Sequence, residues 1–315
     1  MFMKRRLYIA LLVLLLTEVD AAAQVACPGL KNPINFAMYP SYSGRIGSKP
    51  LNSRSICGTN QLGMVFTNDI IPNTQLAAQT SVANRYFCAL GTIEDDKRFR
   101  IMSYDEGTCQ GWLQGRDPNT NCYLPYCPPG FEKSIRVGQC RIMAEAEALY
   151  YTMTVTPDNA LVFVNYAIVV QAPGHGVTQD PEFVVRVTRQ NGTSFDPISD
   201  TLCYVVSSTP VNEGGTVVLG QDGWHGDGSG DYRVFYRDWN KVAINLYNYL
   251  YQNVRIEIMI CDCGGTGHYG YCYVAGDCQS MRLEVNSCAA GETEDVATIA
   301  APSGLAAYQW YKSRT

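Results

Sequence analysis

Two of the three histidines lie in similar surroundings. His175 and His268 each directly follow a glycine, in a turn-like segment after an apolar run. If these runs form neighbouring strands, the two imidazoles could share a metal ion with Asp180 or Asp262, because zinc accepts nitrogen and carboxylate ligands. Two histidines make a poor zinc set, however, and the simpler interpretation is that each supports the backbone of its turn. We therefore expect structural roles for His175 and His268.

A segment rich in glycine and aspartate, residues 221–231, reads Q-D-G-W-H-G-D-G-S-G-D. Carboxylates of Asp222, Asp227 and Asp231 could hold a calcium ion, which takes oxygen ligands from short loops. An EF-hand is excluded, because Tyr232 stands where that loop requires glycine. The simpler interpretation is a glycine-rich turn. No cofactor is required, and a structural calcium ion is the alternative that the loop allows.

Aromatic side chains in and after this segment suggest a ligand-binding surface. Trp224 lies beside His225, and Tyr247, Tyr249 and Tyr251 follow at alternate positions. In a strand these tyrosines would share one face, and exposed rings can stack on sugars. We take Trp224, His225 and Tyr249 as candidate ligand-binding residues. The competing interpretation is that the tyrosines pack beneath a neighbouring segment.

Signatures of catalysis are missing from the sequence. There is no G-x-S-x-G nucleophile motif and no H-E-x-x-H zinc motif. Glu145 and Glu147 are two residues apart, and we expect them at a solvated edge. Asn191 opens an N-glycosylation sequon, and residues 200–202 fit a bacterial O-glycosylation pattern, although both patterns are short. The sequence therefore predicts a protein without enzymatic activity.

Composition and the first residues indicate an exported chain. The net charge is −5 and only 17% of residues are charged, so no basic face is available for nucleic acid. Basic residues at 4–6, an apolar run at 7–16 and alanines at 21–23 predict a signal peptide over residues 1–23. A signal anchor and a lipoprotein site at Cys27 are alternatives, but the apolar run is short and Gln24 does not fit a lipoprotein box. With no other apolar run long enough to span a membrane, we expect a secreted or outer-surface protein.

Thirteen cysteines in an exported chain predict disulfides, although spacing does not determine their pairing. Cys288 lies where the sequence changes character, and we assign it to a following domain. The other twelve are the disulfide candidates, namely Cys27, Cys57, Cys88, Cys109, Cys122, Cys127, Cys140, Cys203, Cys261, Cys263, Cys272 and Cys278.

The elements that carry these residues read as strands. Residues 160–170 form an apolar run rich in Val and Ile, too short to span a membrane and typical of a strand buried on both faces. Shorter alternating runs surround it, among them residues 148–156, 181–189, 241–251 and 254–261. We therefore predict an all-β, antiparallel sandwich over residues 24–285, with a disulfide-rich N-terminal part.

A second domain is expected to begin at residue 286. Cys288 is followed by Tyr308 and Trp310 in the Tyr-x-Trp pattern of an immunoglobulin-like strand, where the Trp packs on a disulfide. Such a domain cannot finish in the residues after Trp310. We interpret residues 286–315 as the beginning of an Ig-like β-sandwich and expect further Ig-like domains in the same polypeptide.

Several short motifs occur in order along residues 24–285, and the set resembles the N-terminal β-sandwich of large bacterial surface proteins that carry tandem Ig-like or PKD-like repeats. The motifs are N-Y-A-I-V-V at 165–170, P-G-H at 173–175, Y-R-D-W at 236–239, D-C at 262–263 and G-H-Y-G-Y at 267–271. The resemblance implies a jelly-roll topology, export by the type IX secretion route, and a role as an adhesin or gliding-motility component.

Two classes of function follow. The first is a non-enzymatic surface module that recognises a glycan or an extracellular protein through loops at one end of the sandwich. The second is the non-catalytic N-terminal module of an exported glycan hydrolase or peptidase whose catalytic part lies beyond residue 315. A purely structural cap domain is a third alternative.

Overall fold

The computed structural model describes residues 33, 35–57, 59, 61–80, 97–171, 178–192, 202–207, 223–227, 234–281, 284–286, 298–301 and 309. Its central strand is the long apolar run, which forms β9 (Leu161–Gln171) and is buried along nearly its whole length. β9 lies inside a six-stranded sheet in the order β12-β13-β9-β15-β7-β4. The other strands of this sheet are β4 (Phe99–Ser103), β7 (Lys133–Gly138), β12 (Trp224–Asp227), β13 (Val234–Asn245) and β15 (Gly270–Gln279).

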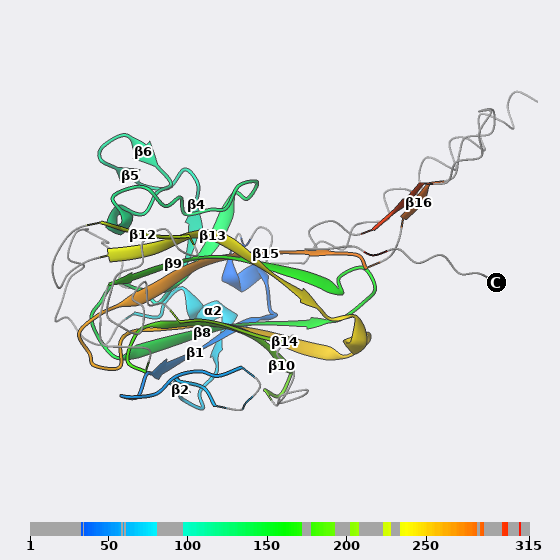
Figure 1. Ribbon diagram of the computed structural model, residues 1–315, viewed down its shortest axis with the longest axis horizontal. Coiled ribbons are helices and arrows are strands. Elements are labelled where there is room, and N and C mark those ends of the chain that lie inside the picture. The colour runs from blue at the N-terminus through cyan, green and yellow to red at the C-terminus, as the bar shows by residue number, and fades with distance from the viewer. Residues whose placement is uncertain are drawn as a thin grey trace, which may run out of the picture.

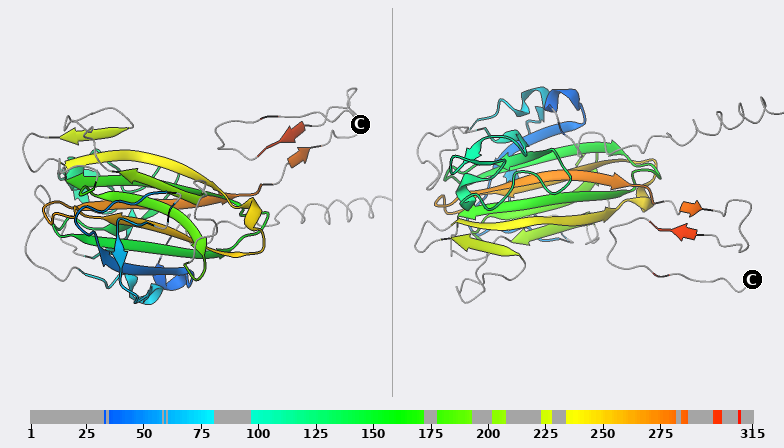
Figure 2. Two further views of the ribbon diagram at one scale, coloured as in Figure 1. Left: turned by 60° about the horizontal axis from the view of Figure 1, so that its bottom comes forward. Right: turned by 90° about the horizontal axis from the view of Figure 1, so that it is seen from above.

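A second sheet lies against the first, as Figures 1 and 2 show. It has seven strands, in the order β11-β10-β14-β8-β1-β2 with β3 paired to β1. They are β1 (Tyr42–Ser48), β2 (Val65–Phe66), β3 (Ile71–Pro72), β8 (Glu145–Thr154), β10 (Glu182–Arg189), β11 (Cys203–Ser207) and β14 (Asn253–Cys261). The pairings in both sheets are antiparallel, and strands β7 to β10 alternate between the sheets along the chain. The predicted jelly-roll-like β-sandwich is therefore confirmed.

The core fills the space between the sheets, and alternation along the strands explains which side chains enter it. On β14, every second residue from Val254 to Ile260 faces inward and is buried. Tyr166 of β9 stacks on Phe183 of β10 with ring centroids 4.7 Å apart, so the two sheets meet through aromatic contact. This packing makes a rigid body from whose ends and edges the loops extend.

The predicted strand over residues 241–251 is partly wrong. Residues up to Asn245 continue β13, which begins at Val234 and has a register shift between Arg237 and Asn240. The chain then turns into a short 3-10 helix, η4 (Tyr247–Tyr249), because buried Leu246 anchors it and the Asn245 side chain accepts the Tyr247 N–H at 2.9 Å. The tyrosines consequently do not form a stripe on a strand.

Short elements surround the two sheets. The chain between β4 and β7 carries β5 (Thr108–Cys109), β6 (Leu113–Gln114) and the 3-10 helix η2 (Pro118–Thr120), and it projects beyond the six-stranded sheet in Figure 1. The first part of the chain contributes η1 (Phe36–Met38) and the short helix α2 (Asn73–Leu76). Residues 61–66 cover part of the outer face of the seven-stranded sheet through Leu62, Met64 and Phe66.

Disulfides join several of these segments. Cys57 pairs with Cys203 of β11, 146 residues later, and Cys109 pairs with Cys122. Cys140 and Cys278 are also disulfide-bonded. Cys27, Cys88 and Cys288 lie outside the described residues.

The expectation that all twelve candidate cysteines form disulfides is wrong for four of them. Cys127, Cys261, Cys263 and Cys272 are buried thiols. Strand alternation separates two of these sulfurs, because Cys272 faces the core between the sheets whereas Cys261 belongs to the cluster on the outer face of the seven-stranded sheet. Burial raises the pKa of Cys127 to about 11, so this side chain is a neutral thiol.

The segment after the sandwich forms its own two-stranded sheet from β16 (Glu284–Asn286) and β17 (Thr298–Ala300). Trp310 and Tyr308, which carried the Ig-like prediction, lie outside the described residues, so that prediction stands untested. Within the part of the chain that the structure describes, no helix is both long enough and apolar enough to cross a membrane.

Candidate functional site

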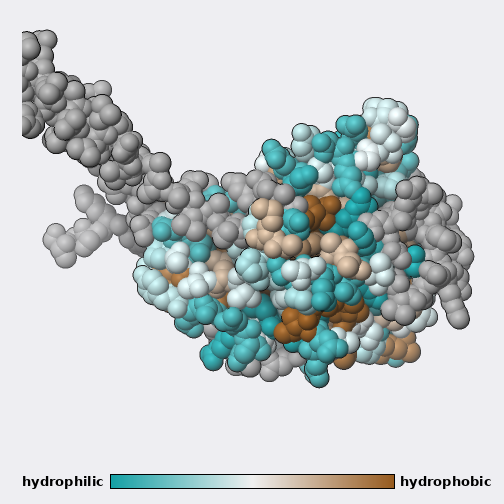
Figure 3. All heavy atoms as spheres, turned by 180° about the vertical axis from the view of Figure 1, so that it is seen from behind, coloured by the Kyte–Doolittle hydropathy of each residue, from teal (hydrophilic) through white to brown (hydrophobic). Residues whose placement is uncertain are grey.

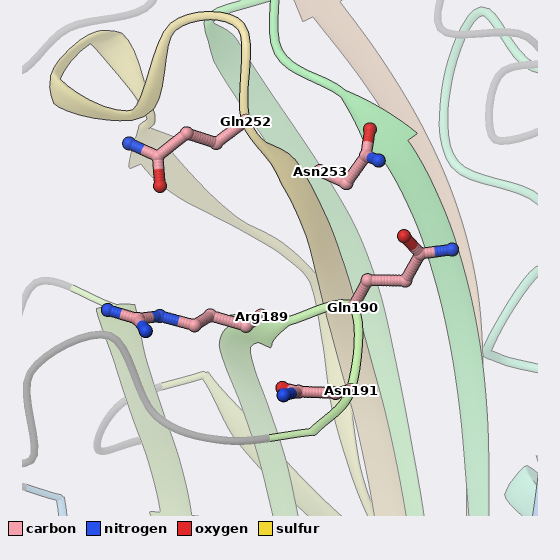
Figure 4. Close-up of a pocket in the computed structure, with 5 residues that line it drawn as sticks. All are labelled: Arg189, Gln190, Asn191, Gln252 and Asn253. Carbon is pink, nitrogen blue, oxygen red and sulfur yellow. The ribbon is translucent and has the colours of Figure 1, made fainter.

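A surface hollow of about 580 Å³ opens at the end of the sandwich where β10 ends and β14 begins. We call it the end pocket. Figure 4 shows its lining, with three side chains from the end of β10 and the turn after it, one from the residue before β14 and one from the first residue of β14. The lining residues are Arg189, Gln190, Asn191, Gln252 and Asn253.

The β10 wall of the end pocket is held by its turn and by a buried ion pair. Gly192 has φ +85°, a conformation that glycine adopts without strain, and its N–H donates to the Arg189 carbonyl at 2.7 Å. Arg255 lies directly beneath this turn and donates to the Gln190 carbonyl at 3.4 Å. Its guanidinium is fixed in turn by the buried carboxylate of Glu257 at 2.6 Å. The turn is therefore supported from below.

The β14 wall is fixed by hydrogen bonds to the neighbouring strand and to η4. Thr154 donates its hydroxyl to the Asn253 side-chain oxygen at 2.7 Å, and the Gln252 N–H donates to the Tyr249 carbonyl at 3.0 Å. Tyr251 is held at φ +65°, unusual for a residue with a side chain, and its N–H donates to the Val155 carbonyl at 2.7 Å. This backbone leaves the Tyr251 ring 76% exposed beside the pocket.

The chemistry of the lining is that of polar recognition. Four of the five side chains are carboxamides, each of which can donate and accept hydrogen bonds, and the fifth is a guanidinium. All five residues are exposed. Tyr247 is 50% exposed on η4, so aromatic rings accompany the amides at this end of the molecule. A set of this kind can bind hydroxyl groups and carboxylates, and it offers no carboxylate pair for hydrolysis.

The structure does not bring the three predicted ligand-binding residues together. Trp224 lies in β12, is only 5% exposed and packs in the core, so the expectation of an exposed Trp224 ring is wrong. The reason is that β12 pairs with β13 and its alternation turns Trp224 inward. His225 faces outward, stacks on Tyr236 with centroids 5.0 Å apart, and contacts the Asp238 carboxylate at 2.7 Å.

Tyr249 lies far from that pair. His225 is opposite Tyr236 near the start of β13, whereas Tyr249 follows the end of that strand, roughly 30 Å away at about 3.3 Å per residue. Tyr249 is half-buried against the core, and its backbone oxygen supports Gln252 of the end pocket. Among the predicted ligand-binding residues, Tyr249 is therefore the one that adjoins the pocket.

The predicted calcium loop falls almost entirely outside the described residues. Asp222 and Asp231 lie there, and Asp227 is seen only as a backbone position of β12, opposite Val234. In the regions that are described, no group of three or more His, Cys, Asp or Glu side chains could hold a metal ion. Calcium binding by this loop remains a prediction.

Of the two turn histidines, the structure describes one. His175 is outside the described residues. The His268 carbonyl accepts the Cys263 N–H at 3.1 Å, which places His268 in the turn between β14 and β15. Asp262, considered as a metal ligand, instead accepts the backbone N–H groups of Glu145 at 3.2 Å and Gly270 at 2.9 Å. These contacts give Asp262 a role in holding the turn.

Sequence reasoning missed a cluster of buried charges between the sheets. Glu145 and Glu147 are buried and both pair with Arg98, so the expectation of a solvated edge is wrong. Alternation along β8 turns both carboxylates inward, together with Leu149. Burial raises the pKa of Glu147 to about 8, Arg98 opposes that rise, and Glu145 adds to it.

The buried position of this cluster argues against catalysis. Asp262 lies near the two glutamates, and burial raises its pKa well above the ordinary value, with Glu147 adding to the effect. The side chains of Arg98 and Glu147 are 3% and 2% exposed, so a substrate cannot reach them from the surface. We assign the cluster to the structure of the sandwich, and no sequence pattern marked it beyond the spacing of two.

Comparisons with known proteins show only distant structural likeness. No protein-family model matches the chain, and no curated protein matches it. A crystal structure of TmCBM61 in complex with beta-1,4-galactotriose has 8% identity and a TM-score of 0.29, covering 58% of this chain and 82% of that one. The enzymatically active domain of bacteriophage CBA120 tailspike protein 4 has 12% identity and a TM-score of 0.25, covering 62% and 21%.

A third solved structure concerns the promiscuous specificity of carbohydrate-binding modules from the β-sandwich superfamily. It has 10% identity and a TM-score of 0.22, and the match covers 69% of this chain and 68% of that one. Identities and TM-scores at this level say nothing of a shared ligand. Any function must therefore be argued from the residues of this chain.

Proposed function

We propose that this protein is a non-catalytic recognition module that binds a glycan in the end pocket. The observation that carries the proposal is the set of four exposed carboxamides and one guanidinium, with Tyr251 directly before Gln252 in the chain and Tyr247 on η4, both exposed. Amides match the donor and acceptor pattern of sugar hydroxyls, and a tyrosine ring can cover the apolar face of a sugar. The Arg189 guanidinium adds a partner for a carboxylate-bearing sugar.

Rigidity of the walls supports the proposal. The turn at Gln190 is held by Arg255, and Asn253 is held by Thr154. A site whose backbone is fixed before binding loses less conformational entropy when the ligand arrives. The lining residues lie where β10 ends and β14 begins, and all five are exposed, so an extended glycan chain could contact them from solvent (Figure 4).

An extracellular setting forms part of the proposal. The Cys57–Cys203 and Cys109–Cys122 disulfides fit an oxidising compartment, as does the predicted signal peptide. We propose that the chain is exported and acts at the cell surface or beyond it, in adhesion or in targeting an attached enzyme. The adhesin family and the type IX route remain expectations of the sequence resemblance.

The test uses the mature chain on an array of neutral and carboxylate-bearing oligosaccharides, followed by calorimetric titration of the ligands that bind. Gln252→Ala removes one exposed amide from the pocket, and Gln61→Ala removes an exposed amide elsewhere as a matched control. We expect Gln252→Ala to weaken binding roughly 3- to 10-fold, the usual cost of one hydrogen bond. Equal affinities for both variants and the parent would exclude the end pocket as the site.

Arg189→Ala tests independently whether the ligand carries a carboxylate. Loss of the guanidinium should weaken carboxylate-bearing oligosaccharides by tenfold or more and leave neutral ones nearly unchanged, because a bidentate charged contact is stronger than a neutral one. If the protein binds peptides through this pocket and binds no saccharide, the glycan proposal is replaced by recognition of a protein ligand.

A further inference from the structure

A second part of the surface exposes aromatic rings. Residues 104–126, which we call the lobe, project from the six-stranded sheet and carry β5, β6 and η2 (Figure 1). Three rings of the lobe face solvent, with Trp112 71% exposed, Tyr123 62% and Tyr104 59%. An indole with this much exposure is unusual in a folded protein, where Trp is highly buried on average. The lobe is distinct from the end pocket and shares no residue with it.

The exposure of Trp112 does not come from a loose chain. Trp112 ends the tight turn between β5 and β6, and its N–H donates to the Cys109 carbonyl at 3.2 Å. The Cys109–Cys122 disulfide closes the base of this turn. Gln110 reaches across to the Asn121 side chain at 3.3 Å, which ties the tip to the segment that carries Cys122. The indole is therefore presented on a fixed backbone.

The other two rings are positioned by equally close contacts. Gly115 packs so tightly on Tyr104 that an added Cβ would lie 1.7 Å from the Tyr104 carbonyl oxygen. The Arg116 guanidinium donates to the Tyr123 carbonyl at 2.6 Å, so its charge is used to hold the backbone. Both tyrosines thus start from fixed backbone positions within the lobe.

A buried polar centre attaches the lobe to the sheet. Asp117 is fully buried and accepts the hydroxyl groups of Tyr271 at 2.7 Å and Tyr273 at 2.8 Å, both on β15. Trp239 donates its indole N–H to the Pro125 carbonyl at 2.8 Å. Several specific buried contacts therefore hold the lobe on the sheet, while three of its aromatic rings remain exposed to solvent.

The surroundings of Trp112 decide which ligand fits. Exposed Gln110 and Gln114 each lie two residues from Trp112, and the exposed Asn121 amide is hydrogen-bonded to Gln110. A Cβ added to neighbouring Gly111 would meet nothing within 4 Å. Aromatic faces bordered by amides suit a sugar ring, which offers C–H groups on one face and hydroxyls at its edge.

We propose that the lobe is a second saccharide site, in which Trp112 stacks on a neutral pyranose ring independently of the end pocket. Asp105 is an exposed carboxylate of the same lobe, ionised at neutral pH, and the Ser103 hydroxyl lowers its pKa further; its charge disfavours an acidic sugar here. The inference rests on the proposed function only for the class of ligand. Two separated sites on one rigid body would let a single module hold a polysaccharide at two points.

The experiment titrates the mature chain with gluco-, galacto-, manno- and xylo-oligosaccharides and follows quenching of tryptophan fluorescence by acrylamide. Of the four tryptophans, Trp112 is exposed, Trp224 is in the core, Trp239 is half-buried and Trp310 lies outside the described residues. The other three are common to parent and variant, so the quenching that Trp112→Ala removes reports the lobe. We expect a bound saccharide to reduce the quenching, and Trp112→Ala to weaken its binding about tenfold or more while Trp112→Phe retains part of it. Far-UV circular dichroism checks that each variant is folded.

Two outcomes would overturn the proposal. One is that no oligosaccharide of the panel protects Trp112 from quenching, whatever Gln252→Ala does at the end pocket. The other is unchanged saccharide affinity in Trp112→Ala together with loss of capture of a protein partner, which would make the lobe a protein-docking surface. Binding that survives Gln252→Ala but not Trp112→Ala would support the lobe and exclude the end pocket, so failures of the two sites are distinguishable.

Discussion

Glu147 shows how a single buried carboxyl couples the stability of the fold to pH. Its side chain lies between the sheets, and Arg98 donates to it at 2.8 Å. One guanidinium faces two glutamates, so burial and mutual repulsion favour a bound proton. The pKa of Glu147 rises from an ordinary value of 4.5 to about 8. The folded state therefore binds this proton more tightly than the unfolded chain does.

The sign of the pH dependence follows from linkage. The contribution of Glu147 to stability is complete below about pH 4.5, and it is lost as the pH rises from there to about 8. We expect the Tm from calorimetry to be lower at pH 8.5 than at pH 5.5. A loss of about 2 kcal/mol would correspond to roughly 4–8 °C in a domain of this size.

Glu147→Gln provides the control for that measurement. The neutral amide cannot lose a proton, so its Tm should change less between the two pH values than that of the parent. Asp262 also has a raised pKa, and part of the slope should therefore remain in the variant. An identical slope in parent and variant would show that Glu147 does not titrate in this range.

Among the elements, the lobe depends on a contact far away in sequence. Asp117 meets Tyr271 and Tyr273 more than 150 residues later, and the three side chains are buried together. Burial raises the pKa of Asp117, while the two hydroxyl donors work in the opposite direction. Removal of the carboxylate would leave two buried hydroxyl groups without their acceptor, which costs about 1–3 kcal/mol for each such group.

We expect Asp117→Ala to loosen the lobe more than the sandwich. Hydrogen exchange should accelerate at the η2 amides, among them Asn119, whose N–H donates to the Asp117 side chain at 2.7 Å. Amides of β9 should keep their protection, because the hydrogen-bond partners of the Asp117 side chain lie on η2 and β15. Uniform acceleration through both regions would instead show that the lobe and the sandwich unfold together.

Strand positions were predictable from sequence where apolar residues alternate or run continuously, as in β9 and β14. The η4 turn was not, because residues 241–251 keep an alternating pattern beyond the point where buried Leu246 turns the chain. The exposure of Trp224 was wrongly predicted for a related reason. A Trp among glycines and aspartates suggests an exposed loop, but pairing of β12 with β13 turns its ring into the core.

The site residues were harder to find than the strands. The end pocket combines a turn after β10 with the start of β14, about 60 residues later, and ordinary amides carry no motif. Exposure of Trp112 is equally invisible in sequence, since it depends on how the lobe attaches to β15. The Asn191 sequon was noticed, yet only the fold reveals that Asn191 lines a pocket.

At the scale of the whole molecule, the pairing of the cysteines can be checked directly by experiment. Peptide mapping without reduction should recover the Cys57–Cys203 and Cys109–Cys122 linkages and thiols at Cys127, Cys261, Cys263 and Cys272. A mapped Cys261–Cys272 disulfide would contradict the arrangement of the sheets, because the two sulfurs lie on different faces.

The long-range disulfide should also contribute much of the stability. Cys57–Cys203 closes a loop of 146 residues and so restricts the unfolded chain. Removal of such a native disulfide typically lowers the stability of a protein by about 2–5 kcal/mol. We expect the double substitution Cys57→Ser and Cys203→Ser to lower the free energy of unfolding in urea by that amount. The Cys109–Cys122 disulfide closes a shorter loop of 13 residues. The same double substitution there should lower the free energy of unfolding less, so it serves as the matched comparison.

The order in which strands join the sheets has a consequence for how the molecule is made. β14 lies between β10 and β8, and β15 lies between β9 and β7, so the last two strands of the sandwich occupy inner positions in both sheets. Until they arrive, each sheet is divided by a gap, and the apolar faces around it cannot close over a core. We expect a nascent chain that ends before residue 253 to lack the native core, and the complete chain to fold slowly because its strand pairings are distant in sequence. If the chain is exported as proposed, late folding of this kind would leave it open for translocation until its final strands have been made.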